Sequence, residues 1–147
     1  MPPARLAARL VVLLQESDDP DTQTACVVHD ATGRVLAEGV NRLPLGVART
    51  DARVTRPAKY DYLVHAEQVA IGTAARQGHA LEGATMVLNW FPCAPCARLM
   101  VTAGIAHLVA DEAVYTARRH DPRYGFEAAE AILREGGVTV GWWSCGP

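Results

Sequence analysis

The sequence predicts an α/β fold with three layers, α-β-α, in which a mixed five-stranded sheet carries helices on both faces. Three observations lead to this prediction. A hairpin pattern near the N-terminus is followed by helices and strands in alternation, and this order places helices against a mixed sheet. Half of the residues are hydrophobic, which is enough for a core. The length of 147 residues suits a single domain, which we expect to span residues 1–147.

A helix and a hairpin begin the predicted order α-β-β-α-β-α-β-α-β. The segment Met1–Leu14 has leucines at positions 6, 10, 13 and 14, a helical spacing that predicts an amphipathic helix packed on the domain. Its uninterrupted apolar run, Leu10–Leu14, is too short for a signal peptide. The segments Thr24–His29 and Arg34–Val40 flank the turn sequence D-A-T-G of Asp30–Gly33, so they are predicted to pair as strands.

Helices and strands alternate after the hairpin. The polar segment Thr50–Lys59 is predicted to be a loop, and the alanine-rich His65–Arg76 a helix. Phe126–Glu135 is predicted to be a helix that ends at the glycine pair 136–137. The remaining predicted elements are the strand Ala84–Asn89, the helix Ala94–Ala103, the strand Ile105–Ala110 and the strand Val138–Trp143.

Composition excludes several classes of protein and partner. Fourteen basic and sixteen acidic residues give a net charge of −2, so we expect no long nucleic acid as a partner. No stretch approaches the roughly 20 apolar residues of a membrane span, so no membrane partner is expected. Four cysteines are too few for a disulfide-dense secreted scaffold. We therefore expect a cytoplasmic protein.

Two short clusters carry the residue types of a metal site. The sequence P-C-A-P-C places Cys93 and Cys96 three residues apart at a predicted helix N-terminus, where both sulfurs share one side and negative charge is favoured. His65 would add a neutral imidazole, so that two thiolates balance the charge of Zn²⁺. Three protein ligands leave a fourth position open, as in catalytic zinc sites. Glu67 lies two residues from His65 and would move protons beside the metal without binding it.

Other interpretations of the cysteines remain open at this point. A lone C-x-x-C is typical of redox proteins and of structural zinc sites, but the redox interpretation does not use His65 or Glu67. A structural site needs a fourth strong ligand, and neither Cys26 nor Cys145 has a partner at metal spacing. The combined pattern H-x-E…P-C-x-x-C is the signature of zinc nucleobase deaminases, which favours a catalytic site.

The chain resembles the cytidine and deoxycytidylate deaminase superfamily, and within it the deoxycytidylate (dCMP) deaminases most. The resemblance runs from about Ser17 to Trp143. Besides the zinc motif, it rests on S-D-D-P-D-T-Q at 17–23, E-G-V-N-R-L-P-L-G at 38–46, K-Y-D-Y-L-V-H-A-E at 59–67 and N-W-F-P-C-A-P-C-A-R-L at 89–99. It implies a cytidine deaminase-like fold and a homodimer or higher homo-oligomer.

The resemblance also implies roles for individual residues. His65, Cys93 and Cys96 would bind Zn²⁺, and Glu67 would be the catalytic proton shuttle. Substrate contacts would come from the Asn41 side chain and the Ala66 backbone, with the Trp90 and Phe91 rings lining the base pocket. Weaker candidates for substrate contacts follow the fourth strand: Tyr115, Arg118, Arg119 and His120.

The implied reaction is the hydrolysis of dCMP to dUMP with release of ammonia. A small molecule would be the substrate in any case, whether a nucleotide, a free nucleoside or a nucleobase such as deoxycytidine, cytosine, guanine or adenine. The family's Trp-x-Arg-Glu segment is replaced here by the short Val47–Ala58, whose Arg49, Arg53 and Arg56 are candidates for phosphate recognition. A second alternative is a zinc-stabilised binding domain without turnover.

Overall fold

A five-stranded sheet in the order β2-β1-β3-β4-β5 forms the centre of the protein. The computed structural model describes residues 3–144, and Cys145 lies outside them. The strands are β1 (Ala25–His29), β2 (Val35–Val40), β3 (Thr85–Leu88), β4 (His107–Asp111) and β5 (Thr139–Trp143). The helices are α1 (Ala4–Leu14), α2 (Asp51–Val54), α3 (Lys59–Tyr62), α4 (Ala66–Gln77), α5 (Ala94–Thr102), α6 (Glu112–Arg118) and α7 (Phe126–Glu135).

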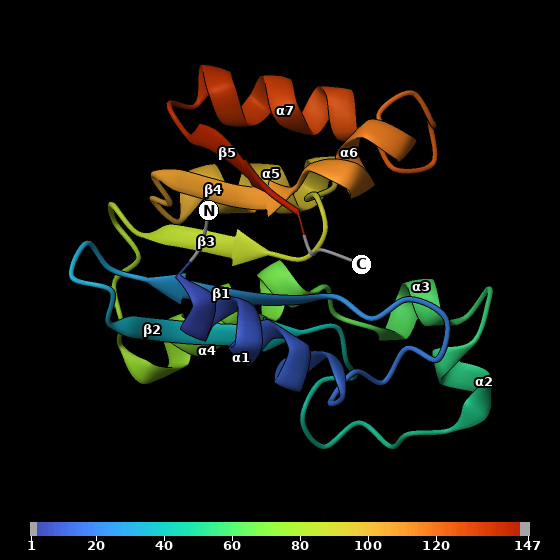
Figure 1. Cartoon of the computed structure of the whole chain (residues 1–147). Helices are drawn as coiled ribbons and strands as arrows, with labels where there is room; N and C mark the ends of the chain where they lie inside the picture. Colours follow the sequence, from blue (N-terminus) through green and yellow to red (C-terminus); the bar gives the residue numbers. More distant parts are fainter. Residues whose placement is uncertain (1–2, 145–147) are drawn as a thin grey trace.

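The strand directions make the sheet mixed, as the sequence predicts. Strand β1 is antiparallel to both β2 and β3, whereas β3, β4 and β5 are parallel to one another. The four strands β2, β3, β4 and β5 therefore end at the same edge of the sheet, near α3 and α6 (Figure 1). Ligands of α/β proteins commonly bind beyond the carboxyl ends of such strands.

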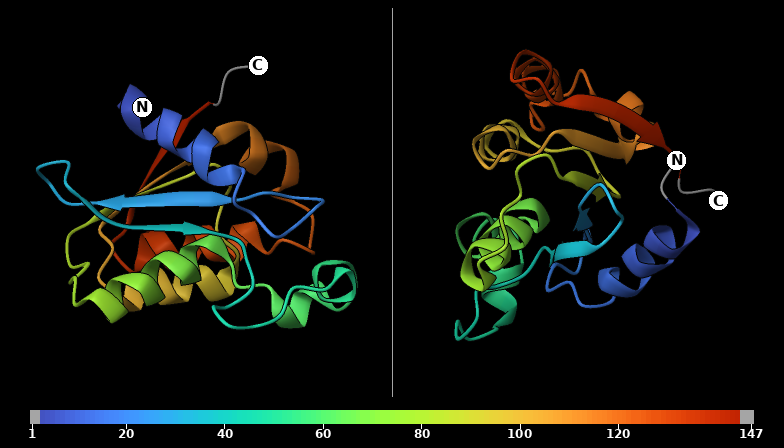
Figure 2. Two further views of the ribbon diagram at one scale, coloured as in Figure 1. Left: turned by 90° about the horizontal axis from the view of Figure 1, so that it is seen from below. Right: turned by 90° about the vertical axis from the view of Figure 1, so that its left-hand side faces the viewer.

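Helices cover both faces of the sheet, which confirms the predicted layers. Alternate side chains of β1 point to opposite faces, with Val27 in the core under α1 and Val28 in the core shared with α4, α5 and α7. Helix α1 buries Leu6, Leu10 and Leu13, which explains the leucine spacing. Figure 2 shows α1 on one side of the sheet and α4, α5 and α7 on the other.

Helix α4 approaches β2 at a position that tolerates no side chain. A Cβ atom on Gly39 would overlap the carbonyl oxygen of Ala66 and come within 2.8 Å of the backbone nitrogen of Ala70. The N-terminus of α4 is also held from within, because the His65 amide donates to the Gln68 Oε1 at 3.1 Å. Glycine at position 39 therefore fixes where the residues His65 to Glu67 lie on the sheet.

The structure contains three short helices that the sequence pattern does not predict. The expected loop Thr50–Lys59 contains α2, which Thr50 caps by accepting a hydrogen bond from the Arg53 amide, and the first residue of α3. Helix α6 lies between the predicted strand Ile105–Ala110 and the predicted helix Phe126–Glu135. Its signal is Asp111, whose side chain accepts hydrogen bonds from the amides of Ala113 and Val114.

Among residues 3–144, no helix combines the length and the apolar character that a bilayer crossing requires.

Replacing Gly39 by alanine is expected to lower the free energy of unfolding by about 1–3 kcal/mol, because the added methyl group forces α4 away from β2. Gly72→Ala is the matched control. Gly72 lies within α4, nothing surrounds its Cβ position, and alanine there is expected to be neutral or stabilising by up to about 1 kcal/mol. Urea denaturation of both variants measures the difference, and equal stabilities of the two variants would contradict the packing described here.

Candidate metal and substrate site

A cavity of about 470 Å³ lies at the carboxyl edge of the sheet. Segments that are distant in the sequence line it. They are the residues before β1 (Asp19, Thr22, Thr24), the end of β2 (Asn41), the α2–α3 region (Arg56, Lys59, Tyr60, Leu63), the N-terminus of α4 (His65, Glu67), the β3–α5 turn (Trp90, Phe91, Cys93) and the residues before and at the start of α7 (Arg123, Tyr124, Phe126). The cavity therefore lies where the sheet topology predicts a ligand.

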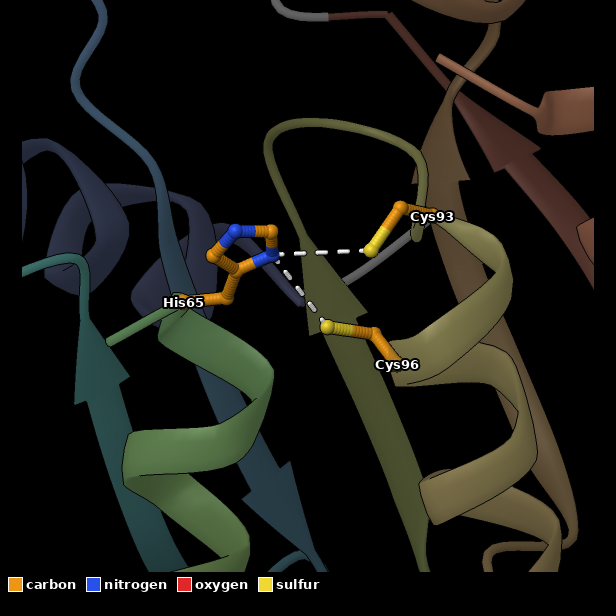
Figure 3. A group of neighbouring side chains, drawn as sticks. All are labelled: His65, Cys93 and Cys96. Carbon is orange, nitrogen blue, oxygen red and sulfur yellow. Dashed lines mark hydrogen bonds between the residues drawn. The ribbon is translucent and has the colours of Figure 1, made fainter. Parts of the chain in front are cut away.

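Three potential metal ligands converge beside this cavity. His65 caps the N-terminus of α4, Cys93 caps that of α5, and Cys96 lies in the first turn of α5. The His65 Nδ1 is 3.5 Å from the Cys93 Sγ and 3.4 Å from the Cys96 Sγ, and all three ligand atoms lie within 4.8 Å of one another (Figure 3). A tetrahedral zinc ion with ordinary bond lengths separates its nitrogen and sulfur ligands by about 3.6 Å. The donor set and its spacing therefore fit Zn²⁺.

The pKa values of the two cysteine thiols are shifted in opposite directions. The hydrogen bond from Cys96, joined by one with His65, lowers the pKa of the Cys93 thiol to about 4. The same hydrogen bond to Cys93, together with burial, raises the pKa of Cys96. The contact with Cys93 also raises the pKa of His65. A divalent cation would stabilise both thiolates at once, so the charge pattern suits a metal as well as the geometry does.

Glu67 is a buried carboxyl group next to these ligands. It is 4% exposed and lines the cavity. Burial raises the pKa of Glu67 to about 7, and this effect exceeds those of its own backbone amide and of His65, which lower it. A carboxyl group with such a pKa exchanges protons readily near neutral pH, as a general acid or base must.

Asn41 lies at the cavity, but most of its hydrogen-bonding capacity is used within the protein. Its Oδ1 accepts from the Ser17 hydroxyl at 2.6 Å and from the Thr24 amide at 2.9 Å. Its Nδ2 donates to the Thr22 carbonyl at 2.8 Å. One Nδ2 hydrogen remains after these bonds. Asn41 therefore holds the segment before β1 against the end of β2 and keeps one donor for a ligand.

The two aromatic residues of the β3–α5 turn both line the cavity. Phe91 is fully buried, and its ring also packs in the core against Tyr115, Phe126 and Trp142, with centroid distances of 4.7, 5.2 and 5.7 Å. Trp90 is half-buried, and the guanidinium of Arg118 lies over its ring at 4.7 Å. Phe91 thus contacts both the cavity and the core, whereas Trp90 contacts both the cavity and Arg118 of α6.

Five of the expected substrate contacts do not line the cavity. The Ala66 carbonyl accepts a hydrogen bond from the Cys26 thiol at 3.4 Å. Tyr115 is buried among aromatic rings, and its hydroxyl donates to Glu130. Two arginines stack on rings, Arg118 on Trp90 and Arg119 on Tyr115. The exposed His120 lies 2.8 Å from Glu127. Each of these five groups thus has a partner within the protein, and none of the five residues is part of the cavity lining.

The cavity also contains charged residues that sequence reasoning did not select. Lys59 is 5% exposed, and its Nζ donates to the Asp19 carboxylate at 3.0 Å, which joins α3 to the segment before β1. Arg123 lines the cavity and forms an ion pair with Asp121 at 2.6 Å. The signal for Lys59 and Asp19 is their place in the segments 59–67 and 17–23, whereas Arg123 has no such signal.

Of the candidate loop arginines, only Arg56 lines the cavity. Its Nε donates to the Tyr60 hydroxyl at 2.9 Å, and no ion pair engages Arg56 within residues 3–144. Arg53 instead donates to the Ala48 carbonyl and lies over the Tyr62 ring. Arg49 pairs with Asp18 and Asp51. The structure thus separates one cavity-facing arginine from two that face other parts of the protein.

A family model and related proteins both indicate similarity to deaminases. Residues 4–112 match the family model of the cytidine and deoxycytidylate deaminase zinc-binding region. The chain is 28% identical over 131 residues to the deoxycytidylate deaminase of Homo sapiens, covering 85% of this chain and 70% of that protein. It is 31% identical over 130 residues to an uncharacterized deaminase of Aliivibrio fischeri, covering 86% and 82% of the two chains.

A solved structure shares the fold. The dCMP deaminase of the cyanophage S-TIM5, in complex with dCMP and dUMP, superposes with a TM-score of 0.75 and 21% identity. The superposition covers 97% of this chain and 99% of that one. At this level of identity the likeness concerns the arrangement of the sheet and its helices.

Replacing Cys93 by serine is expected to weaken zinc binding by well over tenfold. Even the loss of a residue that only hydrogen-bonds to a metal ligand weakens metal binding about tenfold, and Cys93 would bind the metal itself. Cys26→Ser is the matched control, since Cys26 is a buried free cysteine outside the group of three ligands. Metal analysis after dialysis against a zinc buffer measures the effect. Equal zinc contents in the two variants would contradict the proposed ligand set.

Proposed function

The chain belongs to the cytidine and deoxycytidylate deaminase family, and on this premise we propose that it hydrolyses dCMP to dUMP and ammonia. The observation that carries the proposal is the buried Glu67 carboxyl group, which lies beside three zinc-type ligands and opens into a cavity with basic residues. A binding domain or a structural zinc site does not require this carboxyl group, and a redox pair requires neither Glu67 nor His65.

Glu67 would carry the protons of the reaction. A zinc ion held by His65, Cys93 and Cys96 would supply Lewis-acid activation of a water molecule. The Glu67 carboxylate would take one proton from this water and deliver it to N3 of the cytosine ring. It would then take the second proton and deliver it to the amino group at C4, which leaves as ammonia. The raised pKa of Glu67 suits a group that must both accept and return a proton near neutral pH.

The remaining cavity residues would bind and orient the nucleotide. Phe91 and Trp90 offer apolar ring surface for a flat base, and Asn41 retains one amide hydrogen as a donor. Arg56 lines the cavity without a carboxylate partner in the described residues, so its guanidinium is available to a phosphate. The relation to the deoxycytidylate deaminase of Homo sapiens supports a nucleotide over a free base.

Glu67→Gln is expected to lower kcat for dCMP by about 10²–10⁴-fold, because the amide cannot accept and return protons. Zinc content is expected to stay at the wild-type level, since Glu67 is not among the metal ligands. Glu135→Gln, an exposed change at the end of α7, serves as the control and is expected to leave kcat unchanged. Full turnover by zinc-loaded Glu67→Gln would overturn the proposed mechanism.

Arg56→Ala is expected to raise KM for dCMP by about tenfold, the loss expected for a hydrogen-bonded charge pair, and to change KM for deoxycytidine much less. Arg53→Ala is the comparison variant, because Arg53 contacts Tyr62 and the Ala48 carbonyl instead of the cavity. Steady-state kinetics with both substrates measure the effect. Similar changes of KM for dCMP and deoxycytidine would remove Arg56 from phosphate recognition.

A further inference from the structure

The connection between α6 and α7 forms one wall of the cavity. Its residues Arg123 and Tyr124 line the cavity, so the position of the connection determines the shape of the cavity on that side. Asp121 accepts hydrogen bonds from the Arg123 guanidinium at 2.6 and 3.1 Å, but this pair lies within the connection itself. A contact with another part of the protein must therefore hold the connection in place.

Arg118 makes such a contact at the end of α6. Its guanidinium carbon lies 4.7 Å from the centroid of the Trp90 ring and 5.9 Å from that of Tyr124. The two rings meet edge to face with their centroids 6.4 Å apart. Arg118 is half-buried, and no ion pair engages it within the described part of the chain. Tryptophan is the aromatic residue that attracts a cation most strongly, and partial desolvation strengthens the attraction.

Trp90 offers a fixed point for this contact. Its carbonyl accepts the Asp111 amide at 3.3 Å, directly before α6 begins. It follows β3 and precedes the ligand Cys93 by three residues, and its side chain lines the cavity. Trp90 is therefore joined to the metal-binding turn through the backbone and contacts the cation of α6 through its ring.

We propose that Arg118 is a positioning residue for substrate binding. Its cation–π contact holds the α6–α7 connection against Trp90, and this contact sets the places of Tyr124 and Arg123 in the cavity wall. Arg118 itself lies outside the cavity lining, and its guanidinium lies over the rings of Trp90 and Tyr124. The inference rests on the proposed function in one respect, because dCMP is the substrate whose affinity it concerns.

Kinetics of two variants test the proposal. Arg118→Ala is expected to raise KM for dCMP about fivefold, the size of one partly desolvated cation–π contact, while kcat stays within about twofold. Arg118→Lys is expected to fall between wild type and Arg118→Ala, because lysine keeps the charge but lacks the planar stacking face. Arg98→Ala, which removes an exposed arginine of α5, is the control and is expected to leave KM unchanged. If Arg118→Ala fails to fold, Arg118→Lys carries the test.

Tryptophan fluorescence tests the contact without any turnover. Acrylamide is expected to quench Arg118→Ala more than the wild type, because the Trp90 ring becomes exposed. This difference is expected to vanish when Trp90 is also replaced by phenylalanine.

If KM for dCMP is unchanged in the Arg118 variants, the proposal is overturned whatever the quenching shows. A variant that loses both its bound zinc and its kcat would also overturn the proposal. If the wild type does not turn over dCMP, the proposed function fails by itself. Unchanged quenching then still overturns the Arg118 contact, and increased quenching that depends on Trp90 supports it.

Discussion

The rest of the site depends on one constraint, that the N-termini of α4 and α5 meet at one point. His65 caps one helix and Cys93 the other, and the Nδ1 and Sγ atoms lie 3.5 Å apart although 28 residues separate them in the sequence. Helix α5 follows β3 directly, whereas α4 reaches its place only because Gly39 admits the Ala66 backbone against β2. The sheet topology thus brings the three ligands together, and one glycine allows the final approach.

The same arrangement brings two thiols and a carboxyl group so close together that a bound cation would stabilise their ionised forms. Helix N-termini favour negative charge, yet two neighbouring thiolates and a carboxylate repel one another. The hydrogen bond from Cys96 lowers the pKa of Cys93 to about 4, while burial raises the pKa of Glu67 to about 7. A group of potential anions this close together costs stability when no cation neutralises it, and groups of this kind concentrate at functional sites. A functional role therefore explains this cluster of side chains better than a contribution to the stability of the fold does.

The features of the fold and site that depend on neighbouring residues can be predicted from the sequence. The leucine spacing of α1, the alternation of strands and helices, and the H-x-E and P-C-x-x-C spacings are properties of neighbouring residues, and the structure brings His65, Cys93 and Cys96 together as expected. The cavity wall is less predictable. Whether Arg53 or Arg56 faces the cavity depends on how two one-turn helices pack, and the contact of Arg118 with Trp90 joins residues 28 positions apart that share no motif.

We propose that this meeting of helix N-termini forms a site for hydrolytic deamination. Ammonia release by the zinc-loaded protein tests it most directly, with dCMP, CMP, deoxycytidine, cytosine, guanine and adenine compared in parallel. Ammonia release from dCMP is expected at a rate that exceeds the rates from deoxycytidine and cytosine. Absence of ammonia from every compound, with zinc bound, would contradict the claim and would favour a zinc-stabilised binding domain.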